Sequence, residues 1–488
     1  MPWNLEIHHI DVGQGDATLI IARQVGLPIG VVPIVRTALI DGGRANQRQR
    51  IDDYINHTLN LARVDVMVAT HYDIDHCGGL TSLLINRVPA AGGGGLVPNP
   101  RFQNTLIFDQ GWPENDNPTV YIRAINGMNN GGFLPGFVGG INHRHRITAR
   151  VRSDNKPPII GRTDNIGMPA SPIPFVFGVL PEDAAIAGAV NQPANWLVGK
   201  EIFWTDVNGN PYPTLLGGAA PAVLPPIPPA GEIPWPGPGP APGTPGGPPA
   251  IFCIAANQYV LQPGGGTLQL QRGVLALPDR VKNEKSLAFL IQFNNFRYYL
   301  GGDIESTQED GIPHVAPNGI MHYLNQNNIL ANRVHAMKVS HHGSNESTTA
   351  NFVNRLMPSA AFVSCGCNNI HGHPVQPVLD RIQACASVQN YYLTQDRSDD
   401  DYNARMGLVA HPAHPGGGHY SDKAITAGAW GPPYDVGPRA EGDVLLTVDE
   451  NQSQGIPAAG GPPVVAGTAF FEVHYNFPGG GVPHIVNH

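Results

Sequence analysis

The sequence has few charged residues, and this shortage limits what its surface can do. Charged side chains make up 14% of the 488 residues and sum to a net charge of −9. A surface with this balance is not one that coats a polyanion. The net charge does not exclude a nucleic-acid substrate, because bound divalent cations reverse the sign locally.

Cysteines and long apolar runs are also scarce. The five cysteines form no Cys-x-x-Cys pair, and their odd number favours a reducing compartment. No uninterrupted apolar run is long enough to span a bilayer, and the first residues show no leader pattern of basic and then apolar residues. We therefore expect a cytoplasmic protein that does not contact a membrane.

Glycine and proline, by contrast, are abundant, with 59 and 48 residues. This composition is typical of long loops around a compact core. Residues 224–249 form a Pro/Gly tract, which cannot build a helix or a central strand. We expect an extended surface segment there, with a docking peptide for a protein partner as the alternative.

We predict three regions along the chain. Residues 1–87 and 280–488 contain the regular strand and helix patterns, the second region with a C-terminal extension. Residues 88–279, which include the Pro/Gly tract, read as an irregular insertion. The two regular regions predict an α/β fold in which two βα halves pack sheet to sheet with helices outside, a four-layer αββα sandwich.

Polar residues follow the buried strands of both halves. The apolar stretch 64–69 precedes Thr70–Gly79 (THYDIDHCGG), and the strand 296–300 precedes Asp303. The ends of strands are where α/β proteins carry their chemistry. The candidate ligands at these ends are His71, Asp73, Asp75, His76, Asp303, His341, His342, His371 and His373.

These residue types predict a metal site. Alternate residues of an extended loop point the same way, so His71, Asp73 and Asp75 can share one side, with His76 at the start of a helix. Imidazole with carboxylate suits Zn²⁺, Mn²⁺ or Fe²⁺. So many ligands favour two ions about 3.5–4 Å apart over one.

Six motifs occur in an order that resembles the metallo-β-lactamase fold, and specifically the hydrolase domain of ComEC-type DNA-uptake proteins. They are DVGQGDA (11–17), LIDGG (39–43), THYDIDHCGG (70–79), YYLGGD (298–303), KVSHHGS (338–344) and HPV (373–375). The resemblance covers residues 5–90 and 285–395.

The resemblance implies a role for each matching position. His71 and Asp73 would bind one metal ion, Asp75 and His76 the other, and Asp303 would bridge the two. His373 would complete the second site, and Asp41 would support the ligands by hydrogen bonding. His341 or His342 would serve catalysis as a proton donor or phosphate-orienting group, and Asp75 is also expected among the catalytic residues.

Two departures from the family pattern stand out. The commonest version of the fold has histidine where this chain has Asp73, and aspartate there resembles the ComEC branch and favours harder ions such as Mn²⁺. The usual additional histidine between the two halves has no clear counterpart, although His143 or His145 could supply it.

We therefore expect a hydrolase with two divalent metal ions, zinc or manganese, that cleaves phosphodiesters, with DNA or another nucleic acid as substrate. The basic run 141–152 could contact phosphates, or it could be a solvated face of the insertion. One alternative is hydrolysis of small esters, lactones, thioesters, amides or cyclic nucleotides. Another is a partner-binding scaffold with a vestigial metal site.

Overall fold

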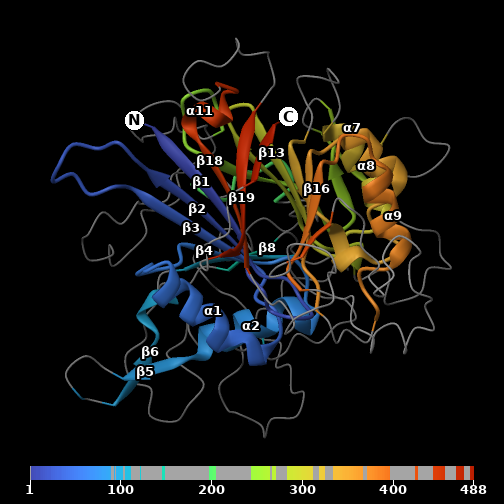
Figure 1. Cartoon of the computed structure of the whole chain (residues 1–488). Coiled ribbons are helices and arrows are strands. Elements are labelled where there is room, and N and C mark those ends of the chain that lie inside the picture. The colour runs from blue at the N-terminus through green and yellow to red at the C-terminus, as the bar shows by residue number, and fades with distance from the viewer. Residues whose placement is uncertain are drawn as a thin grey trace, which may run out of the picture.

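The computed structural model describes most of the two regular regions (Figure 1). The described residues are 2–89, 93, 95–102, 105–110, 121, 146–148, 197–204, 243–263, 266–270, 283–311, 318–324, 334–366, 371–395, 424–426, 443–456, 469–477 and 484–487. The statements below concern these residues. His143, His145 and residues 224–242 of the Pro/Gly tract lie outside them.

The first sheet has nine strands among the described residues, and the pairing of its neighbouring strands changes from antiparallel to parallel at β3. It runs antiparallel from β20 to β3 and parallel from β3 to β8. In spatial order the strands are β20 (His484–Asn487), β19 (Phe470–Phe477), β18 (Asp443–Asp449), β1 (Trp3–His9), β2 (Thr18–Gln24), β3 (Val35–Ile40), β4 (Val66–Ala69), β7 (Leu106–Asp109) and β8 (Arg146–Thr148).

The second sheet repeats this design in the described part of the chain. It is antiparallel from β11 to β13 and parallel from β13 to β17. In spatial order its strands are β11 (Thr267–Gln269), β10 (Tyr259–Leu261), β9 (Ala250–Ala256), β12 (Ala288–Phe293), β13 (Phe296–Gly301), β14 (Ala336–Lys338), β15 (Ala360–Val363), β16 (Asn390–Leu393) and β17 (Ala424–Thr426).

Apolar side chains on opposite faces of the same strand pack in two different clusters. In β2, Ile20 belongs to a core cluster that contains residues of both sheets, whereas Leu19 and Ile21 pack in a second cluster with residues of α1 and α2. Successive side chains of a strand point to opposite faces, so one strand serves both clusters. The two sheets therefore share a core, and the first sheet also has an apolar outer face covered by helices.

Helices lie on both sides of the pair of sheets (Figure 1). On the first sheet are α1 (Arg48–Asp53), which continues as the π-helical turn η2 (Tyr54–Thr58), and α2 (Ile74–Ile85). The others are α6 (Ser306–Glu309), α7 (Ile320–Leu324), α8 (Ala350–Leu356), α9 (Gln376–Ala384) and α11 (Glu450–Ser453). The short elements are the turns η1 (Ala45–Gln47), η3 (Pro100–Phe102) and η4 (Ser340–Gly343), and the hairpin β5 (Arg87–Pro89) with β6 (Leu96–Pro98).

The mixed α/β class predicted from the sequence is confirmed, with one correction near the polar cluster. Helix α2 begins at Ile74 with Asp73 at its N-cap position, so Asp75 and His76 lie in its first turn. The prediction that Asp75 stands on an extended loop was wrong. In the region predicted as an irregular insertion, the structure describes regular strands, with β7 in the first sheet and β9 in the second.

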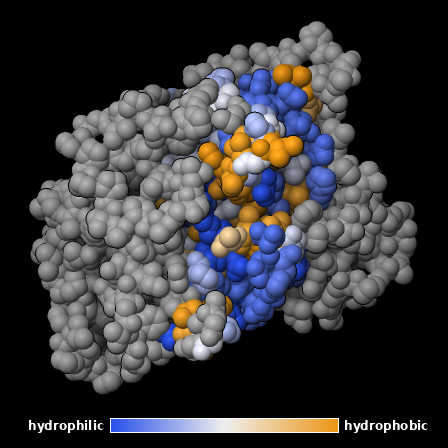
Figure 2. All heavy atoms as spheres, turned by 90° about the vertical axis from the view of Figure 1, so that its left-hand side faces the viewer, coloured by the Kyte–Doolittle hydropathy of each residue, from blue (hydrophilic) through white to orange (hydrophobic). Residues whose placement is uncertain are grey.

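The described part of the chain contains no helix that could span a membrane. None of the described helices is long and apolar enough to cross a bilayer. Seen from the left-hand side of Figure 1, the described surface is largely hydrophilic with separate apolar patches (Figure 2). The connection between β2 and β3 exposes Ile29, Val31 and Val32.

Gly79 lets α2 approach the loop after β3 closely enough to set the position of His76. Its backbone N–H donates to the carbonyl of Gly43 at 2.7 Å, and the N–H of Gly42 donates to the carbonyl of His76 at 2.9 Å. A Cβ atom at Gly79 would lie 1.7 Å from the carbonyl oxygen of Gly42. Helix and loop would then have to separate.

We expect Gly79→Ala to lower the free energy of unfolding by about 1–3 kcal/mol, because a methyl group is forced into a packed contact. The matched control is Gly266→Ala, where a Cβ atom meets nothing within 4 Å and the change should stay within about 0.5 kcal/mol. Urea denaturation measures both variants. Equal effects would contradict the close-approach argument.

Candidate metal centre

The polar residues come together where the parallel strands of both sheets end. His71 follows β4, Asp303 follows β13, and His341 and His342 lie in η4 directly after β14. The N–H of Leu287 donates to the carbonyl of Thr70 at 2.9 Å, which ties the ends of the two sheets together. Segments more than 200 residues apart thereby meet at one site.

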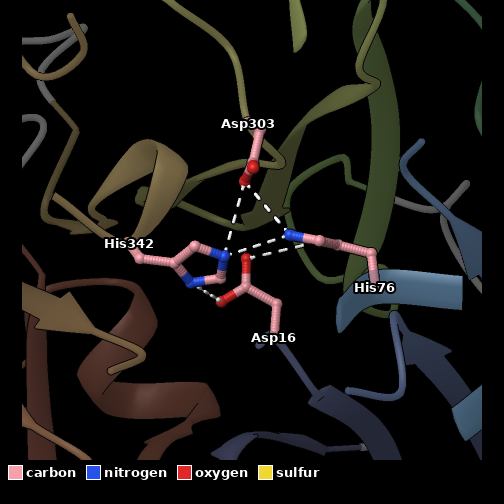
Figure 3. A group of neighbouring side chains, drawn as sticks. All are labelled: Asp16, His76, Asp303 and His342. Carbon is pink, nitrogen blue, oxygen red and sulfur yellow. Dashed lines mark hydrogen bonds and ion pairs between the residues drawn. The ribbon is translucent and has the colours of Figure 1, made fainter. Parts of the chain in front are cut away.

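His76, His342 and one oxygen of Asp303 face one another in the buried part of the site (Figure 3). The Nε2 atoms of the two histidines are 3.1 Å apart. Oδ1 of Asp303 lies 3.2 Å from Nε2 of His76 and 3.8 Å from Nε2 of His342. His76, His342 and Asp303, together with Asp16, form the group with metal-ligand spacing in the described part of the chain, each offering one ligand atom within 4.8 Å of the others.

The hydrogen bonds of the two histidines indicate that a cation fits between them. Nδ1 of His342 lies 3.1 Å from the carbonyl oxygen of Ser364, and Nδ1 of His76 lies 2.8 Å from Oδ2 of Asp41. Both partners accept, so each Nδ1 carries a proton and each Nε2 can present a lone pair. Two lone pairs this close repel each other unless a proton or a metal ion lies between them.

Asp41 is held in place by the same loop that presents His71. It accepts from the backbone N–H of Thr70 at 2.8 Å and from the Thr70 hydroxyl at 2.7 Å. Its backbone is left-handed, with φ of 58°, a conformation that aspartate and asparagine tolerate better than most residues. The hydrogen bond between Asp41 and His76 fixes the ring orientation of His76, which is the supporting role expected for Asp41.

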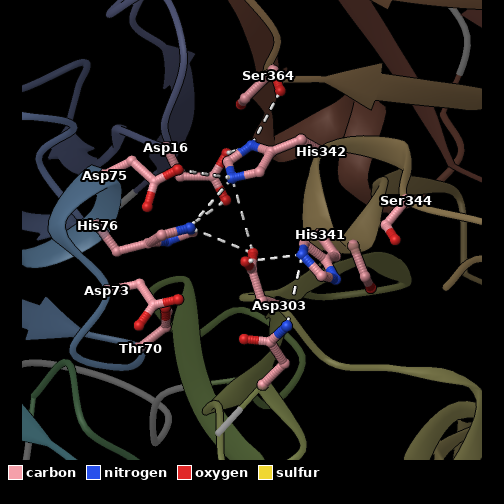
Figure 4. Close-up of polar contacts among 12 residues, drawn as sticks. Asp16, Thr70, Asp73, Asp75, His76, Asp303, His341, His342, Ser344 and Ser364 are labelled. Carbon is pink, nitrogen blue, oxygen red and sulfur yellow. Dashed lines mark hydrogen bonds and ion pairs between the residues drawn. The ribbon is translucent and has the colours of Figure 1, made fainter. Parts of the chain in front are cut away.

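The second oxygen of Asp303 faces a different pair of histidines, His71 and His341, of which His341 is labelled in Figure 4. Oδ2 lies 3.5 Å from Nε2 of His71 and 3.4 Å from Nε2 of His341. Asp73 adds a carboxylate oxygen 3.9 Å from Nε2 of His71, and this side chain is 44% exposed. The carboxylate of Asp303 thus stands between two groups of possible ligands, and the group that contains His71 and Asp73 is open to solvent at Asp73.

Asp75 stands beside the buried group. Its Oδ2 lies 3.9 Å from Nε2 of His342 and accepts from Nε2 of Gln14 at 3.3 Å. The side-chain oxygen Oε1 of Gln14 in turn accepts from the Arg44 guanidinium at 2.9 Å. The loop 11–17 and α2 thereby hold Asp75 at the rim, where its side chain is 16% exposed.

Asp16 belongs to the buried group but lies on the other side of the histidine rings. It is 3.4 Å from Nδ1 of His342 and 3.8 Å from Nδ1 of His76, whereas Asp303 faces Nε2 of both. Asp16 is also paired with the Lys338 ammonium at 2.5 Å, and both side chains are almost fully buried. We interpret Asp16 as a support of the rings and not as a direct ligand.

Lys338 was missed as a site residue in the sequence, and it connects three segments. Besides Asp16, its ammonium donates to the carbonyl of Gly301 at 3.2 Å and to that of Val339 at 3.3 Å. A lysine is almost never fully buried unless it is paired. The signal in the sequence was a single cation inside the apolar strand that leads to His341 and His342.

The charges of the buried group depend on one another. Burial lowers the pKa of His76, but the carboxylates of Asp303 and Asp41 raise it well above its usual value. Burial raises the pKa of Asp303, but His341 and His76 lower it well below its usual range. Without a metal ion, His76 therefore holds a proton that an arriving ion would displace.

The remaining candidates lie farther along the same edge. The ring centroid of His373 is 5.2 Å from that of His341 and 6.5 Å from that of His342, and burial lowers its pKa to about 3. His371 is exposed, 5.8 Å from His373 between ring centroids. His342, expected to serve catalysis, thus lies in the group with metal-ligand spacing, and His373, expected to be a ligand, lies beside it.

Comparisons with known proteins agree with the motifs. Residues 35–94 match the family model of the metallo-beta-lactamase superfamily. Over 102 residues the chain is 35% identical to ComE operon protein 3 of Bacillus subtilis (strain 168), which is 21% of this chain and 12% of that protein. The resemblance predicted from the motifs is confirmed, and it supports a metal-dependent hydrolase.

We expect Asp41→Asn to weaken metal binding by about 10–100-fold, the usual loss when a partner of a ligating histidine is removed. Asparagine keeps the left-handed backbone but cannot accept hydrogen bonds on both side-chain heteroatoms. Isothermal titration with Zn²⁺ and Mn²⁺ measures the change. Unchanged affinity would show that Asp41 does not orient His76.

We expect Lys338→Met to lower the free energy of unfolding by about 3–5 kcal/mol, because it leaves the carboxylate of Asp16 buried without its cation. The double variant Asp16→Asn with Lys338→Met removes both charges and should recover most of this loss. Chemical denaturation of the three proteins measures it. A double variant as unstable as the single one would contradict the pairing argument.

Proposed function

We propose that the chain is a hydrolase with two divalent metal ions that cleaves phosphodiester bonds, with DNA as the leading substrate. The observation that carries the proposal is the position of Asp303, whose Oδ1 faces His76 and His342 while its Oδ2 faces His71. A carboxylate whose two oxygens face separate histidine groups is the arrangement that a bridging ligand requires.

The proposed ligands fall into two groups. His71 and Asp73, with Oδ2 of Asp303, would hold the first ion, and Asp75, His76 and His342, with Oδ1 of Asp303, would hold the second. In this set His342 is a ligand of the second ion, the role that the sequence had suggested for His373. Zinc and manganese both suit imidazole with carboxylate. When bound, such ions activate a water molecule as nucleophile and stabilise charge on a phosphoryl group.

The protein residues would prepare this chemistry by holding and shielding the ligands. His71, His76, His342 and Asp303 are buried, so their orientations are fixed before a substrate arrives. Asp73 and the neighbouring Ile74, which is 63% exposed, mark the open side of the site. A substrate would approach from there and meet the first group before the second.

The fold supports the same proposal at a coarser level. Two sheets, each of nine strands in the described part of the chain, share one core, and helices lie on both sides of them. This favours the four-layer αββα sandwich expected from the sequence. The preference for DNA rests on the resemblance of the six motifs to the ComEC-type hydrolase domain.

We expect the purified protein to cleave plasmid or single-stranded DNA in Mn²⁺ or Zn²⁺ and to lose activity after chelation. Asp303→Asn should lower kcat by at least about 10²–10³-fold, a loss typical of removing one electrostatic group from an active site. The control Asp53→Asn changes a half-exposed aspartate of α1 and should leave kcat unchanged. Circular dichroism checks that both variants are folded.

A parallel panel of small esters, lactones, thioesters and cyclic nucleotides tests the choice of substrate. Turnover of a panel member without DNA cleavage would retain a hydrolase and exclude the nuclease. No turnover of any substrate with either ion would overturn the proposal and leave a binding role.

A further inference from the structure

The first group of proposed ligands is one histidine short. It contains His71, Asp73 and Oδ2 of Asp303, and the residues considered from the sequence for an additional ligand, His143 and His145, lie outside the described part of the chain. A zinc site with three protein ligands and one open position commonly contains two or three histidines. A further imidazole near Oδ2 of Asp303 would complete the group.

We propose that His341 is this ligand, so that neighbouring histidines of one turn bind different ions. Its Nε2 lies 3.4 Å from Oδ2 of Asp303, and Nε2 of His71 lies 3.5 Å from the same oxygen. The two imidazoles therefore approach one carboxylate oxygen at nearly equal distances. This assignment rests on the proposed function, because it presumes two ions bridged by Asp303.

The backbone of η4 explains how neighbouring residues can serve two ions. His341 and His342 both have left-handed backbone conformations, with φ of 50° and 51°. The ring centroids of the two residues are 6.3 Å apart, and their Nε2 atoms face opposite oxygens of Asp303. The N–H of His341 donates to the carbonyl of Gly302 at 3.1 Å, which ties this turn to the loop that carries Asp303.

The surroundings of His341 resemble those of a ligating histidine. Its Nδ1 lies 3.8 Å from Oε1 of Glu305, so a carboxylate stands on the side of the ring away from Asp303, beyond the 2.8 Å hydrogen-bond distance between Asp41 and His76. Nδ1 of His341 and Nε2 of His71 are both buried without a hydrogen bond. Asn283 approaches Nε2 of His341 at 3.5 Å, close to the upper limit for a hydrogen bond.

The test counts metal ions in the wild type, His341→Asn and His373→Ala. Asparagine tolerates the left-handed backbone at position 341 but removes the imidazole. After equilibration with Mn²⁺ or Zn²⁺ and removal of excess metal, elemental analysis gives the stoichiometry and calorimetry gives each affinity. Electron paramagnetic resonance of the Mn²⁺ form distinguishes a coupled pair of ions from an isolated ion.

We expect two ions in the wild type and in His373→Ala. His341→Asn should retain one ion at wild-type affinity. The other ion should bind more weakly, by a factor larger than the roughly 10–100-fold lost when a hydrogen-bonding partner of a ligating histidine is removed. The Mn²⁺ spectrum of the variant should be that of an isolated ion. If His341→Asn does not fold, His341→Gln, which has a neutral side chain of comparable length, takes its place.

Two ions in His341→Asn with unchanged affinities would overturn the assignment of His341 and leave the proposed function intact. The loss of an ion from His373→Ala but not from His341→Asn would overturn it in favour of His373. A wild type that binds fewer than two ions would instead overturn the binuclear proposal itself, so the two failures are distinguishable.

Discussion

Asp303 is a buried carboxylate placed among four histidines, and the geometry of the site depends on its charge. Its two oxygens lie within 3.8 Å of the Nε2 atoms of His71, His76, His341 and His342. Burial of an isolated carboxylate would be costly. The carboxylate of Asp303 raises the pKa of His76, and a proton on this ring or a metal ion offsets that cost. The same surroundings make this position suitable for a cation and unsuitable for a neutral side chain.

The pair Asp16–Lys338 carries this arrangement into the rest of the fold. It joins the loop after β1 to the ends of β13 and β14, and it lies on the Nδ1 side of the histidines that face Asp303. Negative and positive groups thus alternate from Asp303 through the rings to Asp16 and then to Lys338. A change at either end alters the electrostatic field at the rings, although Lys338 touches neither ring in any described contact.

The secondary structure was largely predictable from local patterns. The apolar runs gave β4 and β13 close to their observed bounds, because strand formation in a buried sheet depends on a short run of apolar and β-branched residues. The start of α2 was not predictable in this way. Asp75 is polar and looks like a loop residue, yet Asp73 is the N-cap and the helix begins at Ile74, before Asp75.

The candidate site was predictable in composition but not in arrangement. The motifs named His71, Asp73, Asp75, His76 and Asp303, and the structure brings all five together. Which histidine of the later motifs faces which oxygen could not be read from spacing. The left-handed backbone at His341 and His342 sends neighbouring side chains to different oxygens of Asp303, and periodicity describes only regular backbone.

The sequence alone therefore determined the kinds of residue at the strand ends, the order of the elements and the likeness to a known fold, since these depend on local composition and order. Only the tertiary structure decided that Lys338 is buried against Asp16, that His342 lies with His76, and that Asp303 presents one oxygen to each group. Those facts depend on contacts between segments hundreds of residues apart, whose distances are set by packing the two sheets together.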